Sequence, residues 1–170
     1  MYASQANNIM NTLYLIRHAK AEEHTFTKDD FDRDLQQKGI DRANKIANEL
    51  KKSLHIDEKT LVISSSANRA IQTAEIFCSI LGYPIDSIQQ TKDIYEAHFT
   101  DILKVINTVS NQFDKLLVFG HNPGLSNLTN YLSHSEIDLA TSNVSILQLE
   151  GDLTFEMLGG GTANLIGLLK

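Results

Sequence analysis

The sequence has little of several things that restrict what a protein can be. It contains one cysteine, two prolines and no tryptophan in 170 residues. A single cysteine excludes an internal disulfide framework. Cys78 lies among apolar neighbours at helical spacing, so we predict a buried core thiol and not a nucleophile. The chain also lacks the run of about 20 apolar residues that a membrane-spanning helix needs, and it lacks a basic and apolar leader. We therefore expect a soluble, cytoplasmic protein with no membrane partner.

Positive charge is scarce as well. Lysine and arginine number 15 against 21 aspartates and glutamates, which gives a formal net charge of −6. This balance excludes the broad basic face that binds nucleic acid. The hydrophobic content of 42% is enough for one buried core. We expect a single domain over residues 11–170, preceded by a flexible tail over residues 1–10, where no periodic pattern occurs.

Three apolar runs each end in residues that can bind phosphate. Their composition, rich in Leu, Ile and Val, is typical of strands buried on both faces. The carboxyl ends of such strands form the ligand crevice of an open α/β sheet, so we expect two arginines and two histidines to share one cationic pocket there. The runs are residues 13–16, followed by Arg17 and His18; residues 61–63, followed by three serines and then Arg69; and residues 116–119, followed by Gly120, His121 and Asn122.

Between these runs, apolar residues recur at the helical period. The order βαβαβαβαββ predicts a three-layer α/β/α sandwich with a mostly parallel central sheet and an antiparallel C-terminal hairpin. We expect the serines at 64–66 to cap the second helix. The helices are predicted over residues 36–52, 67–81 and about 102–109 and from Pro123 onward; the hairpin pairs residues 144–149 with 153–158, and residues 164–169 add an edge strand.

Arginine and histidine suit different parts of phosphate chemistry. A phosphoryl group in transfer spreads negative charge over three equatorial oxygens, which fixed positive charge stabilises. Guanidinium groups such as those of Arg17 and Arg69 offer planar pairs of donors and stay charged. A neutral imidazole is a nucleophile near pH 7, and once phosphorylated it is a good leaving group for water. The pocket therefore has the residue types for phosphoryl transfer through histidine.

Three motifs resemble those of the histidine phosphatase superfamily, whose fold is phosphoglycerate mutase-like. Residues 15–19 (Leu-Ile-Arg-His-Ala) resemble its Arg-His-Gly motif, residues 64–74 its second arginine motif, and residues 120–124 (Gly-His-Asn-Pro-Gly) its second histidine motif. The motifs follow the family order across nearly the whole chain, and jointly they are specific. The short chain and the variants Arg-His-Ala-Lys and Gly-His-Asn-Pro-Gly are most similar to the SixA-type phosphohistidine phosphatases.

The resemblance implies roles for individual residues. It makes His18 the phosphoryl-accepting nucleophile, with Arg17, Arg69 and His121 binding the phosphate oxygens, and it implies a metal-independent phosphatase without a cofactor. Many relatives also use a carboxylic acid after the third strand to protonate an ester leaving group, and Glu96 lies at about that place. An exposed loop glutamate is an equal alternative for Glu96.

Further substrate contacts are expected from residues near the motifs. Lys20 follows the nucleophile by two positions and faces either phosphate or solvent, Asn122 follows the second histidine, and Arg33 is a rim charge or a solvated loop residue. Two departures from the family pattern stand out. Ala19 replaces the usual glycine, and residues 32–36 (Asp-Arg-Asp-Leu-Gln) stand where relatives tend to show Arg-Pro-Leu-Thr.

Three functions compete on this sequence. The first, implied by the SixA resemblance, is dephosphorylation of phosphohistidine on a protein through a phosphohistidine intermediate on His18. The short chain offers no long insertion to roof the pocket, which favours a protein substrate. The second is a small-molecule phosphomonoesterase with the same mechanism. The third is a module that recognises phosphate without turnover, which the presence of His18 disfavours. Expected partners are thus a phosphorylated protein or a small phosphate ester.

Overall fold

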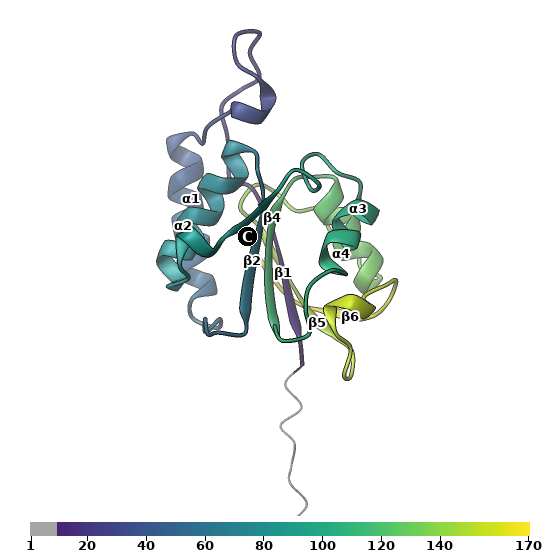
Figure 1. Cartoon of the computed structure of the whole chain (residues 1–170). Helices are drawn as coiled ribbons and strands as arrows, with labels where there is room; N and C mark the ends of the chain where they lie inside the picture. Colours follow the sequence, from purple (N-terminus) through teal and green to yellow (C-terminus); the bar gives the residue numbers. More distant parts are fainter. Residues whose placement is uncertain (1–9) are drawn as a thin grey trace, which may run out of the picture.

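The computed structural model describes residues 10–170, so the predicted tail over residues 1–10 lies outside the described residues except for Met10. Strands and helices alternate along the chain in the expected order (Figure 1). They are β1 (Thr12–Arg17), α1 (Gln37–Leu50), β2 (Thr60–Ser65), α2 (Asn68–Leu81), β3 (Gln89–Thr91), α3 (Phe99–Ile106), β4 (Lys115–Gly120), α4 (Gly124–Ser133), β5 (Val144–Leu149) and β6 (Ala163–Leu169), with short 3-10 turns η1 (Asp30–Asp32), η2 (Ile85–Ser87) and η3 (Phe155–Met157).

The six strands form one sheet in the order β3-β2-β4-β1-β5-β6. The first four strands in this order are parallel to one another. Strand β5 runs antiparallel to both β1 and β6. Figure 1 shows α1 and α2 on one side of the sheet and α3 and α4 on the other. The predicted three-layer α/β/α sandwich with a mostly parallel sheet is therefore confirmed.

Each side of the sheet has its own apolar core, because the buried strands direct alternate side chains to opposite faces. Under α1 and α2, Ile16 and Phe119 pack with Cys78. Burial raises the pKa of the Cys78 thiol to about 12, and its predicted place in the core is confirmed. Under α3 and α4, Leu15 and Val118 pack with the apolar faces of those helices. No helix in residues 10–170 is both long and apolar enough to cross a membrane.

The predicted hairpin was wrong in its second strand. Residues 153–158 do not pair with β5; they contain the 3-10 turn η3, and β6 is the strand that pairs with β5. Phe155 and Leu158 are buried and lie three positions apart, which is the period of a 3-10 helix. The apolar residues that led to the strand prediction therefore belong to a 3-10 turn. The side-chain amide of Asn107 donates to the carbonyls of Phe155 and Leu158 at 2.8 and 3.3 Å. These bonds tie the turn to the end of α3.

The predicted serine cap of α2 was also wrong. The residue before the helix is Ala67, which makes no side-chain capping bond. Ser65 Oγ instead accepts from the Ala67 N–H at 3.3 Å and lies 2.8 Å from His121 Nε2. The Ser65 hydroxyl therefore contacts His121 at the end of β4 and does not cap α2.

Two glycines let helices approach the segments that carry polar residues. A Cβ at Gly39, in the first turn of α1, would lie 2.2 Å from the Lys20 carbonyl oxygen. A Cβ at Gly124, where α4 begins, would lie 2.4 Å from the Ala97 carbonyl oxygen. Any larger residue at either position would push the helix away from the backbone beside His18 or Glu96.

Candidate active site

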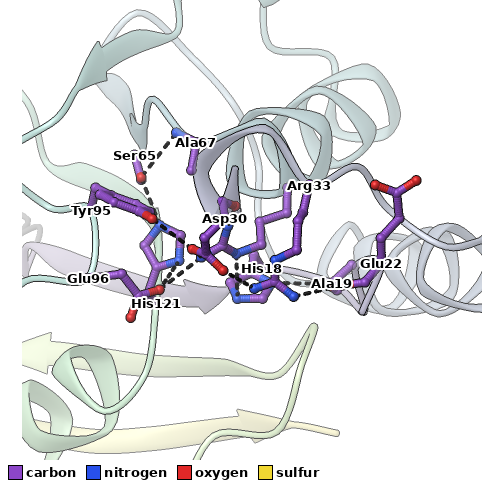
Figure 2. A network of polar contacts seen from close by, with 11 residues as sticks. His18, Ala19, Glu22, Asp30, Arg33, Ser65, Ala67, Tyr95, Glu96 and His121 are labelled. Atoms are coloured by element: carbon purple, nitrogen blue, oxygen red, sulfur yellow. Dashed lines mark hydrogen bonds and ion pairs between the residues drawn. The ribbon is translucent and has the colours of Figure 1, made fainter. Parts of the chain in front are cut away.

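The pairing of β1 with β4 sets the two predicted histidines side by side. Arg17 ends β1 and is paired with Gly120, which ends β4. The chain therefore continues into His18 and His121 at the same level of the sheet edge. The His18 N–H donates to the Gly120 carbonyl at 3.0 Å, and the two imidazole ring centroids lie 5.1 Å apart. Figure 2 shows both rings within one polar network.

His18 is held as a neutral imidazole. Its Nδ1 lies 2.8 Å from the carbonyl oxygen of Ala19, which can only accept, so Nδ1 carries the proton. Its Nε2 accepts from Arg69 Nε at 3.3 Å. Burial lowers the pKa of His18 to about 4; the bond to Ala19 opposes this shift, and the charges of Arg69 and Arg17 add to it. At pH 7 Nε2 therefore has the lone pair that a nucleophile requires.

Arg69, the second residue of α2, is almost completely buried beside His18, with 1% of its side chain exposed. Its Nη2 contacts a carboxylate oxygen of Asp30 at 2.9 Å and one of Glu96 at 2.8 Å. Its Nη1 donates to the Asp30 carbonyl at 2.6 Å. Together with the bond to His18, four of its five N–H groups are engaged. A bound anion must therefore replace one of these carboxylates to receive more than one hydrogen bond from Arg69.

Arg17 keeps more of its donors available. Its Nη1 donates to the Leu139 carbonyl at 2.7 Å. Its Nε is buried and has no hydrogen-bond partner among residues 10–170. A buried donor without a partner costs about 1–3 kcal/mol, and a phosphate oxygen would remove that cost. Burial lowers the pKa of Arg17 from its ordinary value, but an arginine stays protonated at neutral pH.

His121 is held by Ser65. The Ser65 Oγ accepts from the Ala67 N–H and lies 2.8 Å from His121 Nε2. On the other side of the ring, Nδ1 is buried without a hydrogen-bond partner in the described chain and faces Glu96 Oε1 at 3.4 Å. A carboxylate oxygen can only accept, so the neutral ring carries its proton at Nδ1 and Ser65 donates to Nε2. Burial, with the nearby His18 and the charge of Arg69, lowers the pKa of His121 to about 3. His121 is thus a neutral donor at Nδ1.

Glu96 places a carboxylate oxygen between Arg69 and His121, two of the predicted phosphate-binding residues. Its Oε1 lies 2.8 Å from Arg69 Nη2 and 3.4 Å from His121 Nδ1 (Figure 2). Because His121 is neutral, this second contact is not an ion pair. Glu96 is half exposed and its φ of 48° is in the left-handed region, so the loop before α3 turns its side chain into the site. The Glu96 carboxylate oxygen therefore occupies the position between Arg69 and His121 where a phosphate oxygen is expected.

A cavity of about 230 Å³ collects most of the predicted residues. It includes the nucleophile candidate, both arginines and Glu96, while His121 lies behind it, against Ser65. The lining residues are Arg17, His18, Lys20, Ala21, Arg33, Arg69, Glu96, Asn122 and Thr141.

The three remaining predicted contacts line this cavity but are engaged to different extents. Lys20 is half exposed and lies 3.1 Å from Glu23. Arg33 is held by Asp30 at 2.7 Å and by the Glu22 carbonyl at 2.7 Å. The side-chain amide of Asn122 donates both its protons to other residues of the protein. Lys20 therefore has the greatest freedom to reach a ligand.

Asn122 joins β4 and α4 to the segment before β5. Its Nδ2 donates to Asp138 Oδ1 and to the Leu139 carbonyl, both at 2.9 Å. Its Oδ1 accepts from the backbone N–H of Ser126 at 3.2 Å and from its hydroxyl at 2.9 Å. The Leu139 carbonyl that Asn122 holds is the one that receives Arg17 Nη1. In this structure Asn122 orients Arg17 indirectly.

Sequence reasoning missed three residues of the network. Asp30 contacts Arg69 and Arg33, and the Tyr95 hydroxyl donates to its Oδ2 at 2.7 Å. Ser65 was read only as a helix cap. Asp30 and Arg69 are 39 positions apart, so no local pattern links them. Tyr95 adjoins Glu96, and this adjacency is the one signal in the chain that could have pointed to it.

The same fold occurs in solved structures. SixA from Agrobacterium tumefaciens, assigned as a phosphohistidine phosphatase, matches with a TM-score of 0.77 at 24% identity, over 94% of this chain and 97% of that one. The protein histidine phosphatase SixA complexed with tungstate matches with a TM-score of 0.77 at 21% identity, over 94% and 96%. These likenesses confirm the SixA-like architecture, and a phosphoglycerate mutase from Bacillus anthracis shares the fold with a TM-score of 0.60 at 15% identity, over 90% of this chain and 92% of that one.

Sequence comparison gives the family. An uncharacterized chloroplastic protein of Arabidopsis thaliana is 26% identical over 98% of this chain and 81% of its own length. The profile of the histidine phosphatase superfamily (branch 1) matches residues 13–127. That span contains both arginines and both histidines of the site, and also Glu96. The chain therefore belongs to branch 1 of the histidine phosphatase superfamily.

Proposed function

We propose that this protein is a phosphohistidine phosphatase that acts on a phosphorylated protein, with His18 as the nucleophile. The observation that carries the proposal is the state of His18. A neutral imidazole with its proton at Nδ1 presents an Nε2 lone pair beside two guanidinium groups. This arrangement supports covalent catalysis, because anion binding alone would gain more from a protonated histidine.

The reaction would proceed in two transfers. In the first, His18 Nε2 attacks phosphorus, the bond from phosphorus to the substrate imidazole nitrogen breaks, and that imidazole leaves neutral because its other ring nitrogen already carries a proton. In the second, the oxygen of a water molecule attacks phosphorus, the bond to Nε2 breaks and returns its electron pair to that nitrogen, and orthophosphate leaves with the protons of the water. Arg17, Arg69 and His121 supply donors and positive charge to the oxygens in both transition states. Arginine charge supports a mechanism that needs no metal ion.

The size of the cavity favours a protein substrate. A volume of about 230 Å³ is below the range of about 300–1,000 Å³ usual for pockets that enclose small ligands. It suits a phosphoryl group whose carrier remains outside. The similarity to SixA complexed with tungstate supports the same reading, since tungstate is an oxyanion of phosphate-like shape.

Glu96 supports a second candidate function, a phosphomonoesterase for small esters. An alkoxide leaving group needs a proton donor, and Glu96 lies beside the proposed phosphate position. A phosphoryl oxygen that takes its place at Arg69 would leave the carboxyl group free to serve as that acid. Imidazole leaves more easily than an alkoxide, so phosphohistidine depends less on Glu96.

Turnover of three substrate classes tests the proposal. A phosphohistidine peptide, an aryl phosphate and common metabolite phosphates are compared at matched concentrations, with and without a chelator. We expect the highest kcat/KM on phosphohistidine and no effect of the chelator. Comparable or higher values on a metabolite would replace the lead function by the second one, and activity restored only by a divalent ion would refute the mechanism.

The nucleophile is tested by His18→Ala, with the exposed His55→Ala as the matched control. We expect His18→Ala to lower kcat by about a thousandfold or more, while tungstate affinity is partly kept by Arg17 and His121. His55→Ala should leave both unchanged. Near-normal turnover in the His18 variant would overturn the assignment.

A further inference from the structure

A second hollow adjoins the catalytic cavity. It has a volume of about 660 Å³ and lies between residues 38–45 of α1 and residues 140–141. Lys20 and Thr141 line both hollows, so the two are neighbours at the surface. We call this second hollow the basic groove; its lining residues are Lys20, Lys38, Asp41, Arg42, Lys45, Ala140 and Thr141.

The basic groove is strongly cationic although the chain is acidic overall. Lys38, Arg42 and Lys45 are spaced by four and three positions on α1, so they lie on one helix face. All three are exposed, and none forms a salt bridge within residues 10–170. Asp41 is the one carboxylate in the lining, and its Oδ1 accepts from Gln37 Nε2 at 2.8 Å. The lining thus has four cations and one anion, and of the four cations Lys20 alone has a carboxylate partner, Glu23 at 3.1 Å, within residues 10–170.

Hydrogen bonds join the groove to the end of β1. Arg42 donates from Nε to the Thr141 carbonyl and from Nη2 to Asn143 Oδ1, both at 3.1 Å. The Ser142 N–H in turn donates to the Arg17 carbonyl at 3.1 Å. The wall of the groove and the residue before His18 therefore share one hydrogen-bonded segment. A ligand bound in the groove would lie beside the segment that carries Arg17 and His18.

We propose that the basic groove docks an acidic segment that flanks the phosphohistidine of the protein substrate. The proposal rests on the proposed function, because the groove would position the carrier of the phosphoryl group. Charge complementarity supports it. An acidic partner is repelled by most of a protein whose net charge is −6, and it is attracted to the groove, where Lys38, Arg42 and Lys45 are exposed beside the cavity. The groove then supplies the substrate selectivity that the small cavity cannot.

The test uses three phosphohistidine peptides of equal length, whose residues flanking the phosphohistidine are glutamates, serines or lysines. We expect kcat/KM to fall in that order for the wild-type protein, by about tenfold or more from the glutamate to the lysine peptide at low salt. High salt should compress the difference. An aryl phosphate, which has no segment for the groove, serves as the reference substrate.

The double variant Lys38→Glu and Lys45→Glu removes the cations that have no structural bonds. Arg42 stays in place because it holds residues 141–143, and Lys20 stays because it lines the catalytic cavity. We expect this variant to lose the preference for the glutamate peptide or to reverse it, with the aryl phosphate rate unchanged within about twofold. The matched control, Lys51→Glu and Lys59→Glu, changes net charge equally at exposed positions where α1 ends and β2 begins, at the opposite edge of the sheet.

Failure of this inference can be told from failure of the proposed function. Equal kcat/KM on all three peptides, or the same loss in the control variant, would overturn the docking groove while phosphohistidine turnover stands. Turnover of the aryl phosphate without turnover of any phosphohistidine peptide would overturn the proposed function and the inference with it. If the groove variant instead lost activity only on a small ester with a second phosphate group, the groove would be a subsite for that ester, and the acidic-segment proposal would be wrong.

Discussion

At the scale of single residues, the position of the proton on His121 depends on its two polar neighbours. Ser65 Oγ lies 2.8 Å from Nε2, and Glu96 Oε1, which can only accept, lies 3.4 Å from Nδ1. The consequence is a proton at Nδ1, which faces the oxygen that Glu96 now supplies and that a phosphate would supply in its place. In the proposed mechanism Ser65 is therefore a positioning residue, because it would act on the bound anion through His121.

Ser65→Ala should lower kcat by about ten- to a hundredfold, because His121 can then protonate Nε2 and lose its donor at Nδ1. Nitrogen chemical shifts of His121 should report the move of the proton from Nδ1 to Nε2, which a purely structural role would not produce. Ser64→Ala is the matched control, since Ser64 is equally buried but donates to the Ser65 carbonyl. Ser65→Thr, which keeps the hydroxyl, should restore activity. An unchanged tautomer in Ser65→Ala would contradict the assignment.

At the scale of elements, the turn η1 covers Arg69 with a carboxylate. Asp30 contacts Arg69 at 2.9 Å and Arg33 at 2.7 Å. Burial alone would raise the pKa of Asp30, but the hydrogen bond from Tyr95 and the charges of the two arginines outweigh it and lower that pKa to about 2. Asp30 is thus ionised at all working pH values, and its charge opposes the entry of a phosphate dianion next to Arg69.

Asp30→Asn should therefore tighten the inhibition by orthophosphate, by about three- to tenfold at low salt, because the amide keeps a hydrogen bond to Arg69 but loses the negative charge. The inhibition constant of orthophosphate against an aryl phosphate measures the effect. Asp32→Asn is the control, since Asp32 is exposed in the same turn and forms no salt bridge within the described residues. Weaker inhibition in Asp30→Asn would show instead that the carboxylate mainly orients Arg69 for phosphate.

Elements differ in how far the sequence alone could predict them. Strands β1, β2 and β4 are continuous apolar runs, and their parallel pairing brings together the residues that follow each run. Strand β3 consists of three polar residues at the sheet edge, so no apolar run marks it. The apolar residues between 153 and 158 allowed either a strand or the turn η3, and the burial of Phe155 in the core is what distinguishes the two. Contacts such as that of Asp30 with Arg69 depend on the path of a loop, which no periodic pattern records.

At the scale of the whole molecule, the site imposes a stability cost that depends on pH. His18 and His121 are buried without charge among cations, and their pKa values are lowered to about 4 and about 3. An unfolded histidine has a pKa of about 6.5. Above that pH both states are neutral, and the histidines do not affect stability. Between pH 6.5 and the folded pKa values, the unfolded chain binds protons that the folded chain cannot, so stability falls as pH falls.

For His18 alone, a pKa of about 4 in the folded protein implies a loss of about 2 kcal/mol of unfolding free energy between pH 8 and pH 5. His18→Gln removes that loss, so urea unfolding should show the variant gaining about 2 kcal/mol on the wild type over this range. Carboxylate titrations are common to both proteins and cancel in the difference. The exposed His55→Gln should run parallel to the wild type. A His18 variant that also ran parallel to the wild type would contradict the lowered pKa, because it would mean that folded His18 titrates like an unfolded histidine and loses its Nε2 lone pair to a proton below about pH 6.5.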